Sequence, residues 1–161
     1  MSGNWRKQKF LDDFPQASIE LSDDTLAQRC KFNFSYFCKQ AAGQNFDEWT
    51  HEQLVKLLNK LSEYSREPLS YWAKQKIGKS GSVLALYGAF PARSDFSHPK
   101  HVPHQAYWAR FRLEQAVRLV GFVLPVAYDQ TPHANGAVFD CNTFYVVFLD
   151  AEHKFYKTEQ K

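Results

Sequence analysis

The side chains best suited to chemistry gather in the last third of the chain. Guanidinium groups hold phosphate oxygens through paired hydrogen bonds and stabilise charge that develops during phosphoryl transfer. A histidine serves as a general acid or base near neutral pH, and a tyrosine donates a hydrogen bond or stacks on a base. The candidates are Arg110, Arg112, Arg118, His153, Lys154 and Tyr156, with Trp108 beside the first two arginines.

Three strand-like runs are expected to position these side chains. In the first run, Trp108, Arg110 and Arg112 alternate with apolar residues and therefore share one face. In the second run, Arg118 lies on the same face as Val120 and Phe122. The third run is apolar throughout, which indicates a strand buried on both faces, and His153 follows its end. The runs cover residues 106–113, 116–123 and 143–149.

The register between the first two strands decides whether the three arginines meet. A two-residue turn at positions 114 and 115 places Arg118 on the opposite face from Arg110 and Arg112. A bulge, or a loop longer by one residue, brings all three to one face. The sequence leaves both registers open.

Two helices are expected before these strands. Thr50 is a good N-cap, and Gln53 lies three residues on, which is the spacing of a capping box. Leucines follow at helical spacing and form one apolar stripe that is expected to face the core. A second helix is expected to begin at Pro68 and to stop near Gly78. The stripe consists of Leu54, Leu57, Leu58 and Leu61.

The order of elements predicts the α+β class. Alternation over residues 30–37 indicates an N-terminal strand. We therefore expect an N-terminal strand and a helical hairpin packed on a mostly antiparallel β-sheet, in a single domain over residues 29–161. Residues 1–28 are expected to form an arm, in which residues 19–21 make a brief strand.

Charge is unevenly distributed along the chain. The net charge of +3 is too small to indicate nucleic-acid binding by itself. Residues 106–123 hold three arginines against one acid, whereas residues 11–28 hold five acids and no base. The basic sheet and the acidic arm are expected to face different partners or each other.

The composition indicates a folded protein. Apolar residues make up 44% and charged residues 23%, as in ordinary globular domains, and no apolar run approaches the ~20 residues of a membrane span. The first residues lack the apolar stretch of a secretion signal, so a cytoplasmic location away from membranes is expected. Cys30, Cys38 and Cys141 have no CxxC spacing, which argues against a disulfide framework or a cysteine zinc site.

Histidines 98, 101 and 104 recur every third residue in a proline-containing loop. In a polyproline II conformation they would line one edge, where imidazoles hold zinc, nickel or copper. No carboxylate stands at matching spacing. An exposed loop beside an RNA or partner site is therefore the favoured interpretation, and neither a metal nor another cofactor is expected.

The sheet-forming segments resemble the sheet of RelE/ParE-like toxins. The resemblance implies one or two helices against an antiparallel sheet and, as in the ribonuclease branch, cleavage of messenger RNA without a metal by sheet arginines and lysines plus a late tyrosine or histidine. The chain is also similar to small uncharacterised prokaryotic and phage-encoded proteins that end in a comparable run. The resemblance is carried by residues 109–113, 118–122 and 144–150, with His153 and Tyr156.

The leading hypothesis is a toxin-like, metal-independent endoribonuclease acting on RNA, with an antitoxin as a possible protein partner. Arg110, Arg112, His153 and Tyr156 are its expected catalytic residues. The alternative is a non-enzymatic module that binds nucleic acid or protein, of the antitoxin or phage-defence type. A third hypothesis is that the acidic arm caps the basic sheet of the same chain or of a second subunit. The expected substrate-binding residues are Arg118, Lys154 and Trp108.

Overall fold

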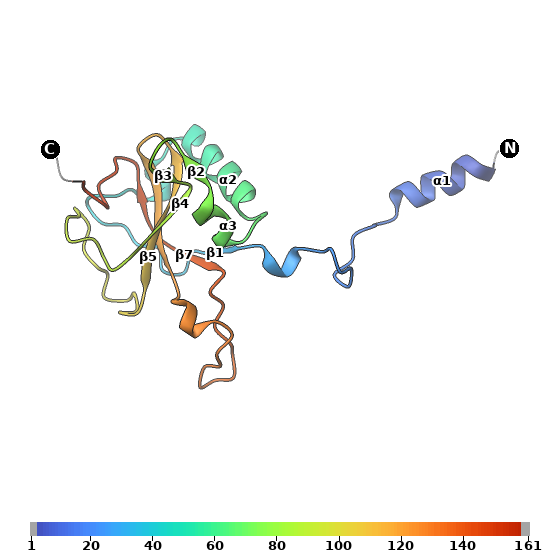
Figure 1. Ribbon diagram of the computed structural model, residues 1–161. Coiled ribbons are helices and arrows are strands. Elements are labelled where there is room, and N and C mark those ends of the chain that lie inside the picture. Colours follow the sequence, from blue (N-terminus) through green and yellow to red (C-terminus); the bar gives the residue numbers. More distant parts are fainter. Residues whose placement is uncertain (1–2, 159–161) are drawn as a thin grey trace.

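The chain folds as an α+β protein around one five-stranded sheet (Figure 1). The computed structural model describes residues 3–158. The strands lie in the order β1-β7-β6-β5-β4; β1 is parallel to β7, and the other neighbouring pairs are antiparallel. Their bounds are β1 (Lys31–Asn33), β4 (Leu84–Gly88), β5 (Tyr107–Glu114), β6 (Val117–Val123) and β7 (Thr143–Asp150).

Helices α2 (His51–Tyr64) and α3 (Leu69–Lys74) pack on one face of this sheet, which confirms the expected helical hairpin. The predicted capping box is present: the Thr50 hydroxyl accepts from the Gln53 amide, and the Gln53 side chain accepts from the Thr50 amide. Leu57 and Leu61 are buried against the sheet. Leu58, by contrast, is 64% exposed, so the apolar stripe is narrower than predicted.

Helix α3 starts at Leu69, one residue after the predicted start at Pro68, and ends at Lys74, before Gly78. The residues beyond it form a separate antiparallel hairpin, β2 (Lys76–Ile77) and β3 (Gly81–Ser82). Gly78 in the hairpin turn has a φ of 64°, which a glycine adopts without strain. The hairpin therefore takes residues that the sequence assigned to the end of the helix.

The second face of the sheet is also covered, so the fold has a core on both sides. Phe96 and Val102 from the segment between β4 and β5, and Phe155 from beyond β7, pack over Phe122 and Phe148 of the sheet. Strand β7 is consequently buried on both faces, as its apolar sequence predicts. The sequence did not predict which segments cover this face, because Phe96, Val102 and Phe155 lie outside the predicted strands and helices.

The first strand is shorter than the alternating run that predicted it. β1 covers Lys31–Asn33 only, and the chain then continues without regular structure toward a 3-10 turn, η2 (Phe46–Glu48). The loop over residues 125–142 begins with another such turn, η3 (Val126–Tyr128). The loops predicted before β5 and before β7 are both present.

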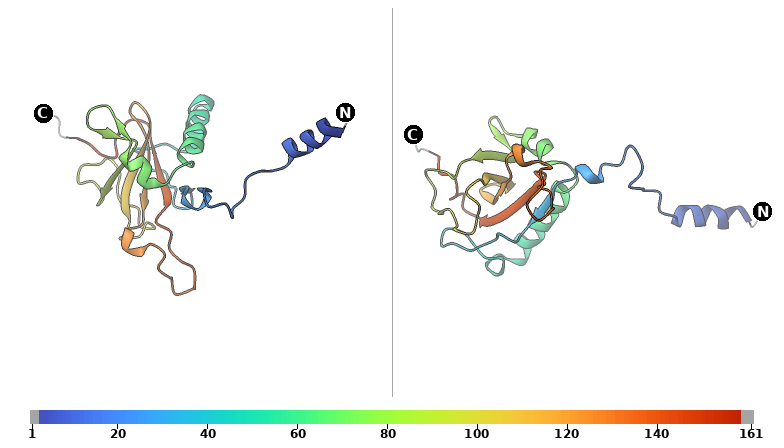
Figure 2. Two further views of the ribbon diagram at one scale, coloured as in Figure 1. Left: turned by 45° about the vertical axis from the view of Figure 1, so that its right-hand side comes forward. Right: turned by 90° about the horizontal axis from the view of Figure 1, so that it is seen from below.

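The arm contains a helix, α1 (Gly3–Asp13), that stands away from the body in every view (Figures 1 and 2). Every residue of α1 is exposed. Residues 19–21 form turns instead of the expected strand, and a 3-10 turn, η1 (Leu26–Gln28), leads into β1. None of the helices in residues 3–158 has the length and apolar character that crossing a membrane requires.

Candidate functional site

The register of β5 and β6 brings the three arginines to one face of the sheet. Arg112 pairs with Arg118, whereas Glu114 pairs with Val117, so a β-bulge interrupts the ladder at this point. Gln115 in the turn has a φ of 35°, in the left-handed region. The register with a turn at positions 114 and 115 is therefore wrong. The bulge supplies the extra residue that returns Arg118 to the face of the other arginines.

Arg118 is the buried member of this arginine cluster, which we define as Arg110, Arg112 and Arg118. Its side chain is only 8% exposed. One terminal nitrogen, Nη1, donates to the carbonyl oxygens of Gln115 and Val117. Its Nε is buried and has no hydrogen-bond partner in the described part of the chain. Burial, and then the charges of Arg110 and Arg112, lower its pKa to about 10, so it still carries its charge at neutral pH.

Arg110 links the sheet to an aromatic pair at its edge. Its Nη1 donates to the Ser82 carbonyl at 2.8 Å, and its Nε donates to the Tyr87 hydroxyl at 3.3 Å. The Tyr87 ring stacks on Tyr156, with ring centres 4.7 Å apart and planes within 6°. Tyr156 is 41% exposed. The contacts hold Arg110 in place and set a stacked, solvent-facing tyrosine beside the cluster.

Arg112 is held through its backbone. Its backbone is fixed on the helix side, because the Tyr64 hydroxyl donates to the Arg112 carbonyl at 2.5 Å and its amide donates to Val83 at 2.9 Å. Its guanidinium is half-buried and makes no hydrogen bond or ion pair with the residues from 3 to 158. A guanidinium whose donors are not taken by protein groups is available to bind an anion.

Asp150 is the carboxylate that the sheet register places opposite Arg118. It is almost fully buried, and its two oxygens accept hydrogen bonds from the Lys154 and Phe155 amides, each at 2.9 Å. Its charge favours the protonated form of Arg118, though less than burial and the other arginines oppose it. One carboxylate against three guanidiniums leaves this corner of the sheet positively charged.

His153 and Lys154 lie in the turn that Asp150 closes, beyond β7. His153 adopts a left-handed conformation with a φ of 58°. Lys154 pairs with Glu152 at 2.7 Å, and this hydrogen bond raises the pKa of Lys154. The positive charge of Lys154 is therefore offset locally, whereas Tyr156 is brought to the cluster through Tyr87.

Trp108 does not line the site. It is 1% exposed and lies in the second core, with its ring centre 5.0 Å from that of Phe90 and 5.6 Å from that of Phe155. Trp108 was predicted to bind substrate, but the segment between β4 and β5 and the segment beyond β7 cover its ring in this structure.

The side chains of the histidine loop do not come together as a metal site in the described part of the chain. His98 bonds through Nδ1 to the Pro99 carbonyl at 2.9 Å, while His101 bonds through Nε2 to the Tyr36 carbonyl at 3.0 Å. Among the described residues, no three side chains of the metal-ligating types come together. The contacts of His98 and His101 fasten the loop over the second core.

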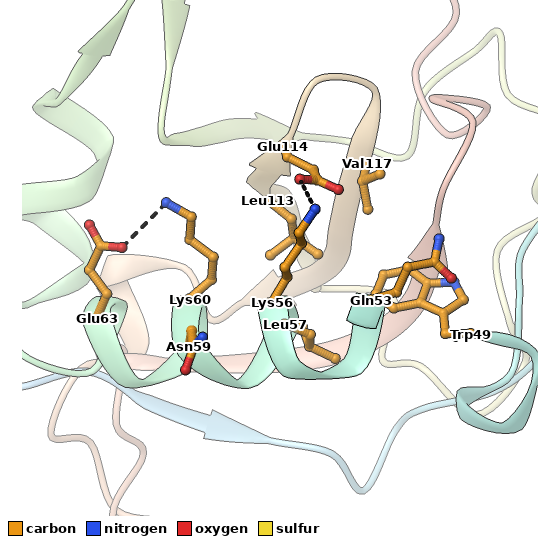
Figure 3. Close-up of a pocket in the computed structure, with 10 residues that line it drawn as sticks. All are labelled: Trp49, Gln53, Lys56, Leu57, Asn59, Lys60, Glu63, Leu113, Glu114 and Val117. Atoms are coloured by element: carbon orange, nitrogen blue, oxygen red, sulfur yellow. Dashed lines mark hydrogen bonds and ion pairs between the residues drawn. The ribbon is translucent and has the colours of Figure 1, made fainter. Parts of the chain in front are cut away.

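A separate cleft of about 370 Å³ lies on the helix side, between α2 and the β5–β6 hairpin (Figure 3). Lys56 pairs there with Glu114 at 3.2 Å, and Lys60 pairs with Glu63 at 3.3 Å. Both lysine charges are thus matched by carboxylates. The cleft offers less uncompensated charge to an anion than the arginine cluster does.

Comparisons with known proteins give this site no precedent: the chain matches no protein-family model, no curated protein and no solved structure.

Two residues of the site were not among the sequence candidates. Tyr87 reaches Arg110 from an irregular part of β4, where Leu86 pairs with Ala109 and Gly88 with Trp108. Asp150 stands out in retrospect, because a carboxylate ends an otherwise apolar strand. A buried charge requires a partner. This requirement could have indicated that Asp150 lies near one of the arginines.

Proposed function

We propose that this chain binds the phosphodiester backbone of RNA at the arginine cluster and cleaves it without a metal. The observation that carries the proposal is the Arg112 guanidinium, which has no hydrogen-bond or ion-pair partner among residues 3–158 and lies across the ladder from buried Arg118. Three clustered guanidiniums repel one another, and a bound phosphate relieves that repulsion. Tyr156 adds an exposed ring on which a base stacks.

In the proposed reaction the 2′-hydroxyl oxygen attacks the adjacent phosphorus, and the bond from phosphorus to the 5′-oxygen breaks. One of His153 and Tyr156 takes the proton of the 2′-hydroxyl, and the other gives a proton to the departing 5′-oxygen. Arg112 binds the charge that builds on the phosphate oxygens. The products are a 2′,3′-cyclic phosphate and a 5′-hydroxyl end.

The test is incubation of end-labelled single-stranded RNA with the purified protein in the presence of a metal chelator. We expect product ends of the cyclic-phosphate type. Arg112→Ala should lower the cleavage rate by about 10²-fold or more, because it removes a hydrogen-bond donor to the charge that develops in the transition state. His153→Ala should lower the rate by a similar factor, because it removes a group that transfers a proton. Arg66→Ala, at an exposed arginine just after α2, removes the same charge elsewhere and is expected to keep full activity. Intact RNA after incubation with wild type contradicts the cleavage step.

One observation favours binding without cleavage as the second candidate function. Lys154 is paired with Glu152, and the Asp150 oxygens accept hydrogen bonds from backbone amides, so neither side chain is open to assist His153 and Tyr156 in proton transfer. A module of this kind retains RNA in a salt-dependent way and gives no product. The same reaction mixtures separate the two candidates.

A further inference from the structure

The body of the protein carries an apolar groove of about 510 Å³ that lies apart from the arginine cluster. Leu69 and Ala73 of α3 and Leu86 of β4 line this groove. The η3 turn contributes Val126, which is 85% exposed, while Leu86 is 47% exposed. Exposed aliphatic side chains gathered around one groove are typical of a surface that another apolar element covers.

The arm carries a set of exposed apolar side chains. Phe10, Leu11 and Phe14 lie at helical spacing on and just beyond α1, and the two phenylalanine rings are 6.2 Å apart. All three are exposed. An isolated helix of eleven residues is marginally stable in water, so α1 gains stability only when this stripe is buried.

The acidic charge of the arm lies at the end of α1 and in the linker after it, since α1 itself carries Arg6, Lys7 and Lys9 beside Asp12 and Asp13. Residues 11–28 contain five acids and no base, whereas residues 68–82, which include α3 and the β2–β3 hairpin, contain three lysines and no acid. The lysines make no ion pair with any described residue. Asp12 and Asp13 lie directly between Leu11 and Phe14, so carboxylates accompany the apolar stripe into contact. The lysines are Lys74, Lys76 and Lys79.

The root of the arm is fastened at the edge of the same groove. The Asn142 side chain donates to the Gln28 carbonyl at 2.6 Å and accepts from the Leu69 amide at 3.0 Å. Leu69 lines the groove, as does Cys141, the neighbour of Asn142. Residues 15–27 between helix and root span up to about 45 Å when extended, which is enough to reach across to another molecule.

We infer that the groove receives α1 from a second copy of this chain, and that two copies exchange arms. Because root and groove adjoin, a single two-fold axis near this edge lets both arms dock at once in a closed, self-complementary dimer. In the structure α1 already points away from its own body (Figure 2). The apolar stripe of α1 fills the groove, and the linker after α1 leads back to the root of its own chain.

The test is sedimentation of the full chain over a concentration series. We expect a dimer for wild type. Phe14→Asp on the arm and Leu86→Glu in the groove should each weaken dimerisation by about tenfold or more. Leu58→Glu, at another exposed leucine, on α2, is the matched control and should leave the dimer unchanged. If Leu86→Glu disturbs the edge strand, Val126→Glu tests the same groove from a loop.

Mixing the two variants distinguishes arm exchange from docking within one chain. In a mixture of Phe14→Asp and Leu86→Glu chains, one intact arm can meet one intact groove, so a heterodimer should form more tightly than either variant alone. A wild-type chain that stays monomeric at all concentrations overturns the inference. So does a dimer that neither the arm variant nor the groove variants weaken.

Discussion

At the residue scale, the site depends on how three like charges are held together. Burial and the two neighbouring guanidiniums all disfavour the charged form of Arg118. Its Nη1 is bonded to two carbonyls of the turn, and Asp150 lies opposite in the ladder. These contacts stabilise the ion but leave Nε without a partner among the described residues. An empty anion site needs cationic groups whose hydrogen-bond donors are not all taken by the protein, and the arginine cluster has such donors.

Tyr64 connects this site to the helix layer, and its ionisation gives an alkaline prediction. Burial raises the pKa of Tyr64 to about 12 from an ordinary value of 10. Between these values the unfolded chain has lost the phenolic proton and the folded chain has kept it, so the free energy of unfolding falls as pH rises from about 10 to about 12.

We expect Tyr64→Phe to flatten that alkaline decline. At neutral pH the variant should lose about 1 kcal/mol, since the hydrogen bond to the Arg112 carbonyl is removed. Urea unfolding at several pH values from neutral to alkaline measures both effects. An unchanged alkaline slope in Tyr64→Phe would contradict the assignment of the decline to this residue.

At the element scale, local patterns predicted helices and strands well but not the way strands pair. The capping box at Thr50 and the apolar sequence of β7 rest on neighbouring residues alone, and both were confirmed. The position of Arg118 depends on one extra residue in the β5–β6 turn, which the sequence left open. Likewise, the end of α3 is decided by the pairing of Lys76 with Ser82, a contact that helix periodicity does not reveal.

Gly121 is a second point at which strand pairing depends on one residue. The β6–β7 register shifts between Val120 and Gly121, and a Cβ on Gly121 would lie 2.0 Å from the Tyr145 carbonyl oxygen. Gly121→Ala therefore forces the two central strands apart. We expect a loss of about 3 kcal/mol or more in unfolding free energy.

Urea denaturation of Gly121→Ala measures this loss. Gly3→Ala is the matched control, because no atom lies within 4 Å of its added Cβ and alanine favours a helix. The control should be as stable as wild type. Equal midpoints for the two variants would show that the β6–β7 shift does not require glycine.

At the scale of the whole molecule, the sheet is covered on both faces, and this decides which candidate residues can act. Sequence periodicity placed Trp108, Arg110 and Arg112 on one face correctly, but it could not show that distant segments cover the tryptophan and leave the arginines at the margin. Phe155, which belongs to the C-terminal segment, is the main example: its ring packs on Trp108 from forty-seven positions away in the chain. Such coverage is a long-range property and has no local signature.

The central claim is that Arg112 and its neighbours hold RNA phosphate. The most direct measurement is the affinity for a single-stranded RNA oligonucleotide between about 50 mM and about 200 mM salt, compared for wild type, Arg112→Gln and Arg66→Gln. We predict that affinity falls as salt rises, and that Arg112→Gln weakens binding and reduces the logarithmic salt slope by about 0.7, the amount for one lost phosphate contact. Arg66→Gln should match wild type. Equal slopes and affinities for the two variants, or no salt-dependent binding by wild type, would contradict the account.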